Sequence, residues 1–177
     1  MLFAGSTSPV ARCSIHRLDQ CENANALIWD KSFDRALAAF LGKHKTEFLY
    51  DGGRLTDEAE AVLGGPPDSR IDLDQRYLFT ACRAHSCHEK GAAVVRKDGQ
   101  IDAIAIVWYP CAGPHRTGRD CPYRARLSIF MRDPTDTALI ARLESWTKSE
   151  LASYESDGLP PVRLERVNLY RRPDPIR

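Results

Sequence analysis

The chain has 177 residues, of which 43% are apolar and 28% are charged, and its formal net charge is +1. This length and composition are typical of one globular domain rather than of a disordered or fibrous chain. A nearly neutral chain has no overall field that would attract nucleic acid or an anionic membrane. No apolar run approaches the roughly 18 residues of a membrane-spanning helix. We therefore expect neither a nucleic-acid partner nor membrane insertion, and no motif in the sequence indicates a cofactor.

The N-terminal part of the chain changes its pattern at Asp30. Residues 1–29 are polar and lack periodicity, so we expect an irregular segment in front of a single domain spanning 30–177. From Asp30 the apolar residues recur at helical spacing, which predicts a helix. Residues 43–50 favour a short strand. The acidic cluster of Asp57, Glu58 and Glu60 is typical of a solvent-exposed face.

The middle of the chain gives the strongest strand signals. The run "RYLFTAC" (76–82) is rich in aromatic and β-branched residues. Two further strand-like runs follow, joined by Asp98-Gly99, a dipeptide that favours a two-residue hairpin turn. Apolar residues in the second run point to both faces, which indicates a strand covered on both sides. One face holds Ile104, Ile106 and Trp108, and the other holds Ala103, Ala105 and Val107.

A strand at 124–131 and a long helix follow the hairpin. Asp133 is expected to cap this helix, with Pro134 at its first position. The apolar stripe of the helix consists of Leu139, Ile140, Leu143, Trp146 and Leu151. The order of helix, antiparallel hairpins and helix predicts an α+β domain, with a central antiparallel sheet and flanking helices.

Six cysteines fall into three close pairs: Cys13 with Cys21, Cys82 with Cys87, and Cys111 with Cys121. Each pair brackets turn-rich sequence, which favours local disulfides, with six buried free thiols as the alternative. Disulfides would indicate an oxidising compartment, such as a bacterial periplasm or the cell exterior. The first residues, "MLFAGSTSPVARC", lack the charged start and apolar stretch of a signal peptide, so no leader is visible in this chain.

The segment "CRAHSC" (82–87) encloses a histidine between two cysteines, and a second histidine follows directly. As a metal site it would crowd four donors into seven residues, which does not suit a tetrahedral ion. As a thiol enzyme it would have Arg83 and His85 nearby to lower the pKa of a thiol, but a nucleophile and its base normally come from different elements, and no third, orienting residue is visible. The alternative of a small thiol- or metal-dependent enzyme would use Cys82, His85, Cys87 and His88.

A disulfide-clamped loop fits this segment better. A ring closed between Cys82 and Cys87 would add only about 2 kcal/mol of stability through chain entropy. It would, however, fix the loop before binding and so remove an ordering cost. The enclosed residues have no large apolar side chain, so we expect the loop to protrude into solvent, with a plain stapled turn as the alternative. The residues expected to contact a target are Arg83, Ala84, His85, Ser86 and His88.

The stretch "YLFTACRAHSCHEKGAAVV" (77–95) resembles the inhibitor of vertebrate lysozyme family, known as Ivy. Members of that family carry a Cys-Lys-Pro-His-Asp-Cys loop directly after a strand. The upstream segment "GKHKTEFLYDGG" (42–53) is also similar to the family's segment after its first helix. The resemblance covers about residues 30–110, and it is in outline only elsewhere.

The resemblance implies an antiparallel sheet with packed helices in a periplasmic or secreted bacterial protein, and a homodimer as in some members. It also implies that the loop plugs the active-site cleft of a lysozyme. His85 would hydrogen-bond the catalytic carboxylates, with Cys82 and Cys87 as the clamp, so the chain would be an inhibitor and not an enzyme. Ala84 and Ser86 replace the family's Pro and Asp. The target could therefore be a peptidoglycan-cleaving toxin of a rival bacterium, which would make the chain an immunity protein.

Overall fold

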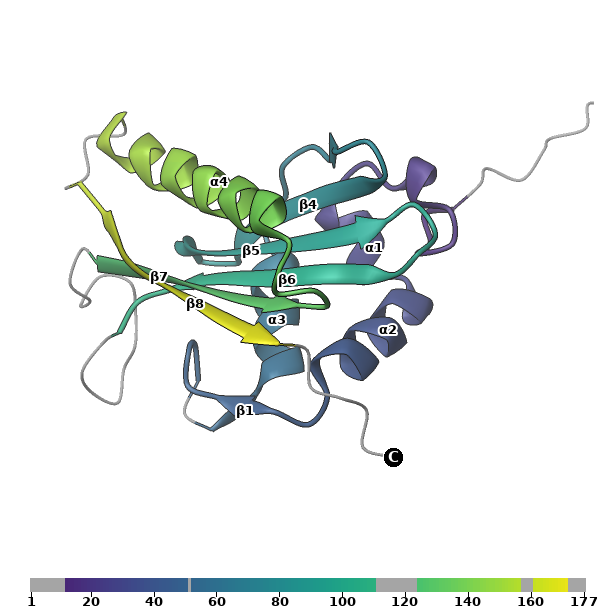
Figure 1. The fold of residues 1–177 in the computed structure, drawn as a ribbon, viewed down its shortest axis with the longest axis horizontal. Helices are drawn as coiled ribbons and strands as arrows, with labels where there is room; N and C mark the ends of the chain where they lie inside the picture. Colours follow the sequence, from purple (N-terminus) through teal and green to yellow (C-terminus); the bar gives the residue numbers. More distant parts are fainter. Residues whose placement is uncertain (1–11, 51, 111–123, 157–160, 172–177) are drawn as a thin grey trace, which may run out of the picture.

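The computed structural model describes residues 12–50, 52–110, 124–156 and 161–171. They form a six-stranded sheet with three helices packed on one face and one long helix on the other (Figure 1). This is the predicted α+β class. A separate sheet of two short strands accompanies the helices of the first face.

The helices are η1 (Leu18–Gln20, a 3-10 helix), α1 (Ala24–Ile28), α2 (Lys31–Leu41), α3 (Leu55–Leu63) and α4 (Thr137–Ser156). The strands are β1 (Lys45–Thr46), β2 (Gly53–Arg54), β3 (Ile71–Asp72), β4 (Arg76–Arg83), β5 (Ser86–Arg96), β6 (Ile101–Trp108), β7 (Arg124–Met131) and β8 (Arg163–Arg171). The helix expected after Asp30 and the strands expected at 76–82 and 124–131 are confirmed. The strand expected at 43–50 is reduced to the two residues of β1.

The main sheet has the order β3-β4-β5-β6-β7-β8. Neighbouring strands are antiparallel from β3 to β7, and Gly99 takes φ 86° in the turn between β5 and β6 that Asp98-Gly99 predicts. β8 pairs with β7 in parallel. After β7 the chain crosses back through α4, so that β8 begins beside the first residue of β7 and runs in the same direction. The prediction of an antiparallel sheet is therefore wrong at this edge, and the sheet is mixed.

The side chains of β6 show why the sheet is covered on both faces. Ile104 and Ile106 are buried in the core formed with α1, α2 and α3. Ala103 and Ala105 are buried on the opposite face together with Leu143 of α4. Successive residues of a strand point to opposite faces, so the predicted alternation is confirmed.

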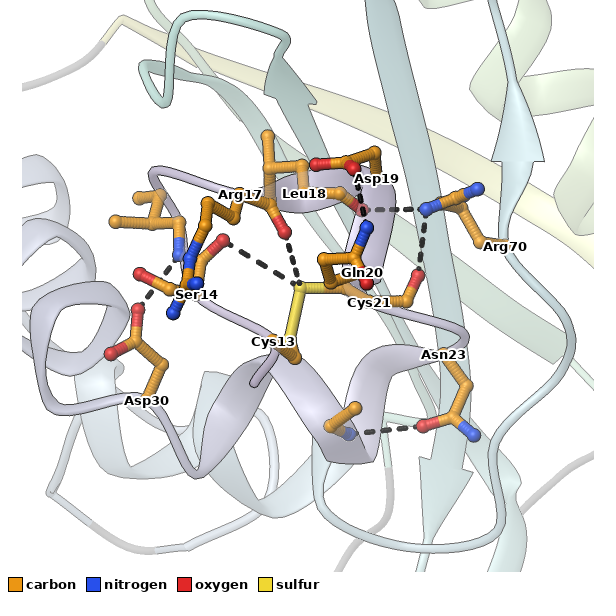
Figure 2. Close-up of a disulfide and its surroundings, with 12 residues drawn as sticks. Cys13, Ser14, Arg17, Leu18, Asp19, Gln20, Cys21, Asn23, Asp30 and Arg70 are labelled. Carbon is orange, nitrogen blue, oxygen red and sulfur yellow. Dashed lines mark hydrogen bonds between the residues drawn. A yellow bond between two sulfur atoms is a disulfide. The ribbon is translucent and has the colours of Figure 1, made fainter. Parts of the chain in front are cut away.

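The expectation of an irregular N-terminal segment is wrong for residues 12–29. This stretch contains η1 and α1, and Leu18 and Leu27 are buried in the core beneath the sheet. The expected Cys13–Cys21 disulfide is formed, and beside it Arg70 donates to the backbone carbonyls of Leu18 and Cys21 (Figure 2). A helix of five residues is too short to show a helical period. The segment therefore belongs to the domain.

The last helix begins later than expected. Asp133 accepts hydrogen bonds from the backbone N–H and the hydroxyl of Thr135, which makes a turn. Asp136 instead caps α4 by accepting from the backbone N–H of Leu139 at 3.0 Å. Pro134 suits a turn as well as a first helical position, so the sequence alone does not separate the two arrangements. The expected stripe is confirmed, since Leu139, Leu143, Trp146 and Leu151 are buried.

Two of the three expected disulfides are formed, Cys13–Cys21 and Cys82–Cys87, and the described residues include no free cysteine. The third expected pair, Cys111 and Cys121, lies outside the described residues. Disulfides of this kind suggest an oxidising setting, either extracellular or periplasmic. In the part of the chain that the structure describes, no helix is both long enough and apolar enough to span a membrane.

Candidate functional site

The segment "CRAHSC" forms the end of the hairpin between β4 and β5. β4 ends at Arg83 and β5 begins at Ser86, so Ala84 and His85 alone make the turn. Both turn residues are exposed, whereas Arg83 and Ser86 pair with each other and are half-buried. The expected protruding four-residue loop is therefore a tighter structure, a two-residue tip that carries one imidazole.

His85 has φ 65°, in the left-handed region that few residues other than glycine adopt. Histidine is less disfavoured there than bulky or β-branched residues. Such a conformation persists only where the surrounding structure imposes it, and it is found at functional sites more often than elsewhere. The rigid base of the hairpin imposes it here.

The Cys82–Cys87 disulfide closes this base. Cys82 pairs with Lys90 and Arg83 pairs with Ser86, so the register shifts between them and residues 87–89 bulge out of the ladder. The disulfide joins the two strands across the bulge, with a Cα–Cα distance of 4.7 Å. Both sulfur atoms are engaged in it, so neither is present as a thiolate nucleophile or metal ligand.

Arg83 holds the base of the hairpin instead of facing a target. Its guanidinium donates to Glu89 at 2.6 Å and lies over the ring of Tyr50, 4.9 Å from the ring centroid. Burial by itself lowers the pKa of Arg83, but the ion pair with Glu89 outweighs this effect and raises the pKa. The Glu89 side chain is almost fully buried, so this pair is screened weakly by solvent. The expectation that Arg83 is displayed in the loop is thus wrong.

The segment that follows α3 packs against the backbone of β4 and forms hydrogen bonds with it. Pro66 accepts a hydrogen bond from the backbone N–H of Cys82 at 3.0 Å, and Asp68 donates its N–H to the carbonyl of Thr80. At Gly65 the backbones approach so closely that a Cβ would lie 2.0 Å from the carbonyl oxygen of Cys82 and 2.5 Å from the nitrogen of Ala84. Glycine is the residue that allows this contact. The tip is therefore supported on its inner side.

Glu58 is a second support, and its role was not expected from the sequence. Its carboxylate is fully buried and accepts hydrogen bonds from the hydroxyl of Thr46 and from the backbone N–H groups of Leu49 and Tyr50. It thereby fixes the segment that places Tyr50 against the guanidinium of the hairpin. The assignment of this carboxylate to a solvated face is wrong. The sequence does contain a sign of this burial, because Glu58 lies at helical spacing on the same face as the apolar residues Leu55, Ala59 and Val62.

His88 lies away from the tip. Its ring is half-buried and meets the ring of Tyr109 edge-on, with 6.4 Å between the ring centroids. Burial, and to a lesser degree the Glu89 carboxylate, raises the pKa of Tyr109 above its ordinary value. The neighbouring Lys90 forms an ion pair with Glu150 of α4 at 2.8 Å. The side chains after Cys87 therefore join the hairpin to α4, and His85 is the group most available to a partner.

The described residues contain no cluster of three His, Cys, Asp or Glu side chains that could hold a metal ion. Cys82 and Cys87 are bonded to each other, and the ring of His88 lies against Tyr109, so these side chains do not form the metal site that the alternative reading requires. What the hairpin can do chemically is to offer one exposed imidazole, able to donate and to accept a hydrogen bond.

Comparison of the chain with protein-family models, with curated protein sequences and with solved structures gave no match.

Proposed function

We propose that the protein is a non-enzymatic inhibitor of a peptidoglycan-cleaving muramidase and acts by inserting the tip of the β4–β5 hairpin into the enzyme's cleft. The observation that carries this proposal is the exposed His85, held at φ 65° on a two-residue turn above a disulfide. A tip of this width enters a narrow cleft, and its backbone is held by the disulfide-closed hairpin before binding. Such pre-organisation lowers the entropic cost of association.

The chemistry of a muramidase cleft suits an imidazole. Glycosidases of this class place two carboxyl groups on either side of the scissile bond, one protonated and one ionised. A neutral imidazole accepts a hydrogen bond from the protonated group and donates one to the carboxylate. His85 would occupy the position of the substrate's glycosidic bond, and the flanking Ala84 leaves space for the walls of the cleft. Substrate is then excluded by simple occupation.

The stretch 77–95, which carries most of the resemblance to the Ivy family, forms this hairpin, and this supports the proposal. A bacterial protein of this function would reside in the periplasm or be secreted, in accord with the disulfides. Its partner would be the muramidase itself, a homodimer is proposed on the same resemblance, and no cofactor is needed.

The test is inhibition of a panel of muramidases of different structural classes, measured with increasing amounts of the protein. Wild type is compared with His85→Ala and with His44→Ala, which removes an exposed histidine on the segment before β1. We expect inhibition by wild type and His44→Ala, and a loss of about 100-fold or more in affinity for His85→Ala, as for a buried interfacial anchor. Equal inhibition by all three proteins would refute the role of the tip.

The same panel separates the two sources of target. If enzymes of animal or phage origin are unaffected, the muramidase toxins that bacteria secrete against rivals are tested next, since Ala84 and Ser86 alter the tip and its flank. Inhibition limited to such a toxin would identify an immunity protein with the same mode of action. Activity of the reduced protein as a thiol enzyme would contradict both.

A further inference from the structure

A shallow groove of about 460 Å³ lies where the end of α1 and the start of α2 meet the second half of α3. It opens to solvent, and the proposed function makes no use of it. The residues that line it are Ile28, Trp29, Lys31, Asp34, Glu60 and Gly64.

Trp29 forms one wall of this groove. Among the large apolar side chains that the structure describes it is the most exposed, at 84%, and the next is Leu169 at 47%. Its backbone is held firmly, because the N–H of Asp30 donates to Leu27 and the carboxylate of Asp30 caps α2 through Ser32. An exposed indole offers its face to a ligand, and a cation is attracted to the face of tryptophan more strongly than to that of any other side-chain ring.

Two carboxyl groups face the same groove. Asp34 of α2 and Glu60 of α3 both line it, so two carboxyl groups lie close together here. Burial, and then the proximity of Asp34, raises the pKa of Glu60; Asp57 adds to this effect and Arg54 opposes it. The lining thus holds two carboxyl groups against the single ammonium of Lys31. A second cation arriving here would lie beside both carboxyl groups and would favour their ionised forms.

The groove adjoins the hairpin. Gly64 lines the groove, and the next residue, Gly65, contacts the backbones of Cys82 and Ala84. The groove is therefore next along the chain to the backbone that packs against the hairpin.

We propose that the groove binds an arginine or lysine side chain of the same protein partner, with its cation over the indole of Trp29 and against the carboxyl groups of Asp34 and Glu60. This proposal rests on the proposed function for the identity of the partner, and the binding itself is a property of this chain alone. Complementary charge beside a shape-matched anchor contributes to selection of the partner.

The direct test uses N-acetyl-arginine amide as the probe, titrated into the isotopically labelled protein while the backbone amide of Gly64 and the indole N–H of Trp29 are followed by NMR. We expect saturable shifts at these positions, and none with the neutral N-acetyl-norleucine amide. Trp29→Ala should weaken the response at Gly64 by about threefold or more, the contribution of one exposed cation–π contact. Glu60→Gln should weaken it as well, while Glu144→Gln on α4 serves as the matched control and leaves it unchanged.

The affinity for the probe should rise with pH, because the cation favours the ionised form of Glu60, and this gain should be absent in Glu60→Gln. Lack of a saturable shift would overturn the proposal. So would equal binding of the neutral probe, or a response of the same signals to chitotriose alone, which would make the groove a saccharide site.

Muramidase inhibition separates this proposal from the function on which it rests. Trp29→Ala should weaken inhibition about threefold or more without lowering the thermal midpoint, since the removed side chain is exposed. His85→Ala should weaken inhibition about 100-fold or more and leave binding of N-acetyl-arginine amide unchanged. Unaltered inhibition by Trp29→Ala would overturn the groove's role alone, whereas unaltered inhibition by His85→Ala would overturn the proposed function.

Discussion

His85 and Glu58 show how single residues of this chain are placed against their intrinsic preferences. His85 takes a left-handed backbone conformation at the exposed tip, and Glu58 buries a carboxylate in the core. Each arrangement costs free energy, of about 1–2 kcal/mol for the backbone and several kcal/mol for an uncompensated charge. Glu58 offsets its cost with three hydrogen bonds, whereas no hydrogen bond to the ring of His85 is found among the described residues. Backbone strain that no other contact offsets is expected at functional positions.

The first prediction follows from the backbone of the tip. His85→Gly should raise the free energy of unfolding by about 0.5–1 kcal/mol, because glycine adopts a positive φ without strain, and should at the same time lose inhibition. Urea unfolding followed by circular dichroism measures the stability. His44→Gly is the control and should not be stabilised. A less stable His85→Gly would mean that the imidazole has a structural role at the tip.

The second prediction concerns the buried carboxylate. Glu58→Ala leaves the hydroxyl of Thr46 and the N–H groups of Leu49 and Tyr50 without their acceptor, which should lower the free energy of unfolding by about 3–5 kcal/mol. Asp57→Ala, on the neighbouring half-exposed position, should cost less than about 1 kcal/mol. Urea midpoints of the two variants decide the matter. Similar losses would show that the burial of Glu58 contributes little.

At the scale of elements, the local pattern of the sequence predicts those segments that are long and regular. The helical period after Asp30, the alternation in β6 and the Asp98-Gly99 turn are all found as expected. Shorter or non-local features are not predictable in this way. The parallel pairing of β8 depends on where α4 directs the chain, and the two-residue strands β1 and β2 depend on the buried Glu58 nearby.

The candidate site divides in the same manner. The cysteine spacing predicts the clamp and the exposure of His85, both of which are local properties. The inward position of Arg83 depends on Glu89 and on Tyr50, which lies more than thirty residues away along the chain. The groove at Trp29 depends on the packing of α1 and α2 against α3. No pattern within a single segment carries that information.

The third prediction concerns the junction of β4, β6 and α4. Arg76 of β4 forms ion pairs with Asp102 of β6 at 2.7 Å and with Asp136, the cap of α4, at 2.8 Å. Arg76→Met should lower the free energy of unfolding by about 2–4 kcal/mol, because it leaves the buried Asp102 with a weaker partner. Arg54→Met removes a solvent-exposed pair with Asp57 and should change the stability much less, because solvent screens such pairs. If Arg76→Met and Arg54→Met lowered the free energy of unfolding equally, the ion pairs of Arg76 would not be important for stability.

At the scale of the whole molecule, one sheet separates two cores and belongs to both. The N-terminal residues 12–29 complete the core under α2 and α3, and α4 completes the other. Because β4, β5 and β6 contribute side chains to both cores, neither core should persist without the other. The two described disulfides link positions close in sequence, so they stiffen local segments more than they connect the layers.

This arrangement leads to the fourth prediction, that the chain unfolds as one cooperative unit. Trp108 reports on the face of α1–α3, where it stacks on Phe48, and Trp146 reports on the face of α4. Two variants, each retaining one of these tryptophans as the sole indole, are unfolded in urea. In each, fluorescence and circular dichroism should give coincident transitions. An earlier transition at Trp146 would instead show that α4 detaches as a separate unit.

The central claim is that the tip at His85 occupies the substrate cleft of a muramidase. The most direct measurement uses the muramidase that the protein inhibits most strongly. The apparent Kd of the protein for this enzyme is measured at increasing concentrations of chitotriose, a saccharide that binds in the cleft. If the protein and chitotriose compete for the same cleft, the apparent Kd of the protein must rise in proportion to the chitotriose concentration, once that concentration exceeds the Kd of chitotriose for the enzyme. An apparent Kd that stays constant, with enzyme, saccharide and protein in one complex, would contradict the account.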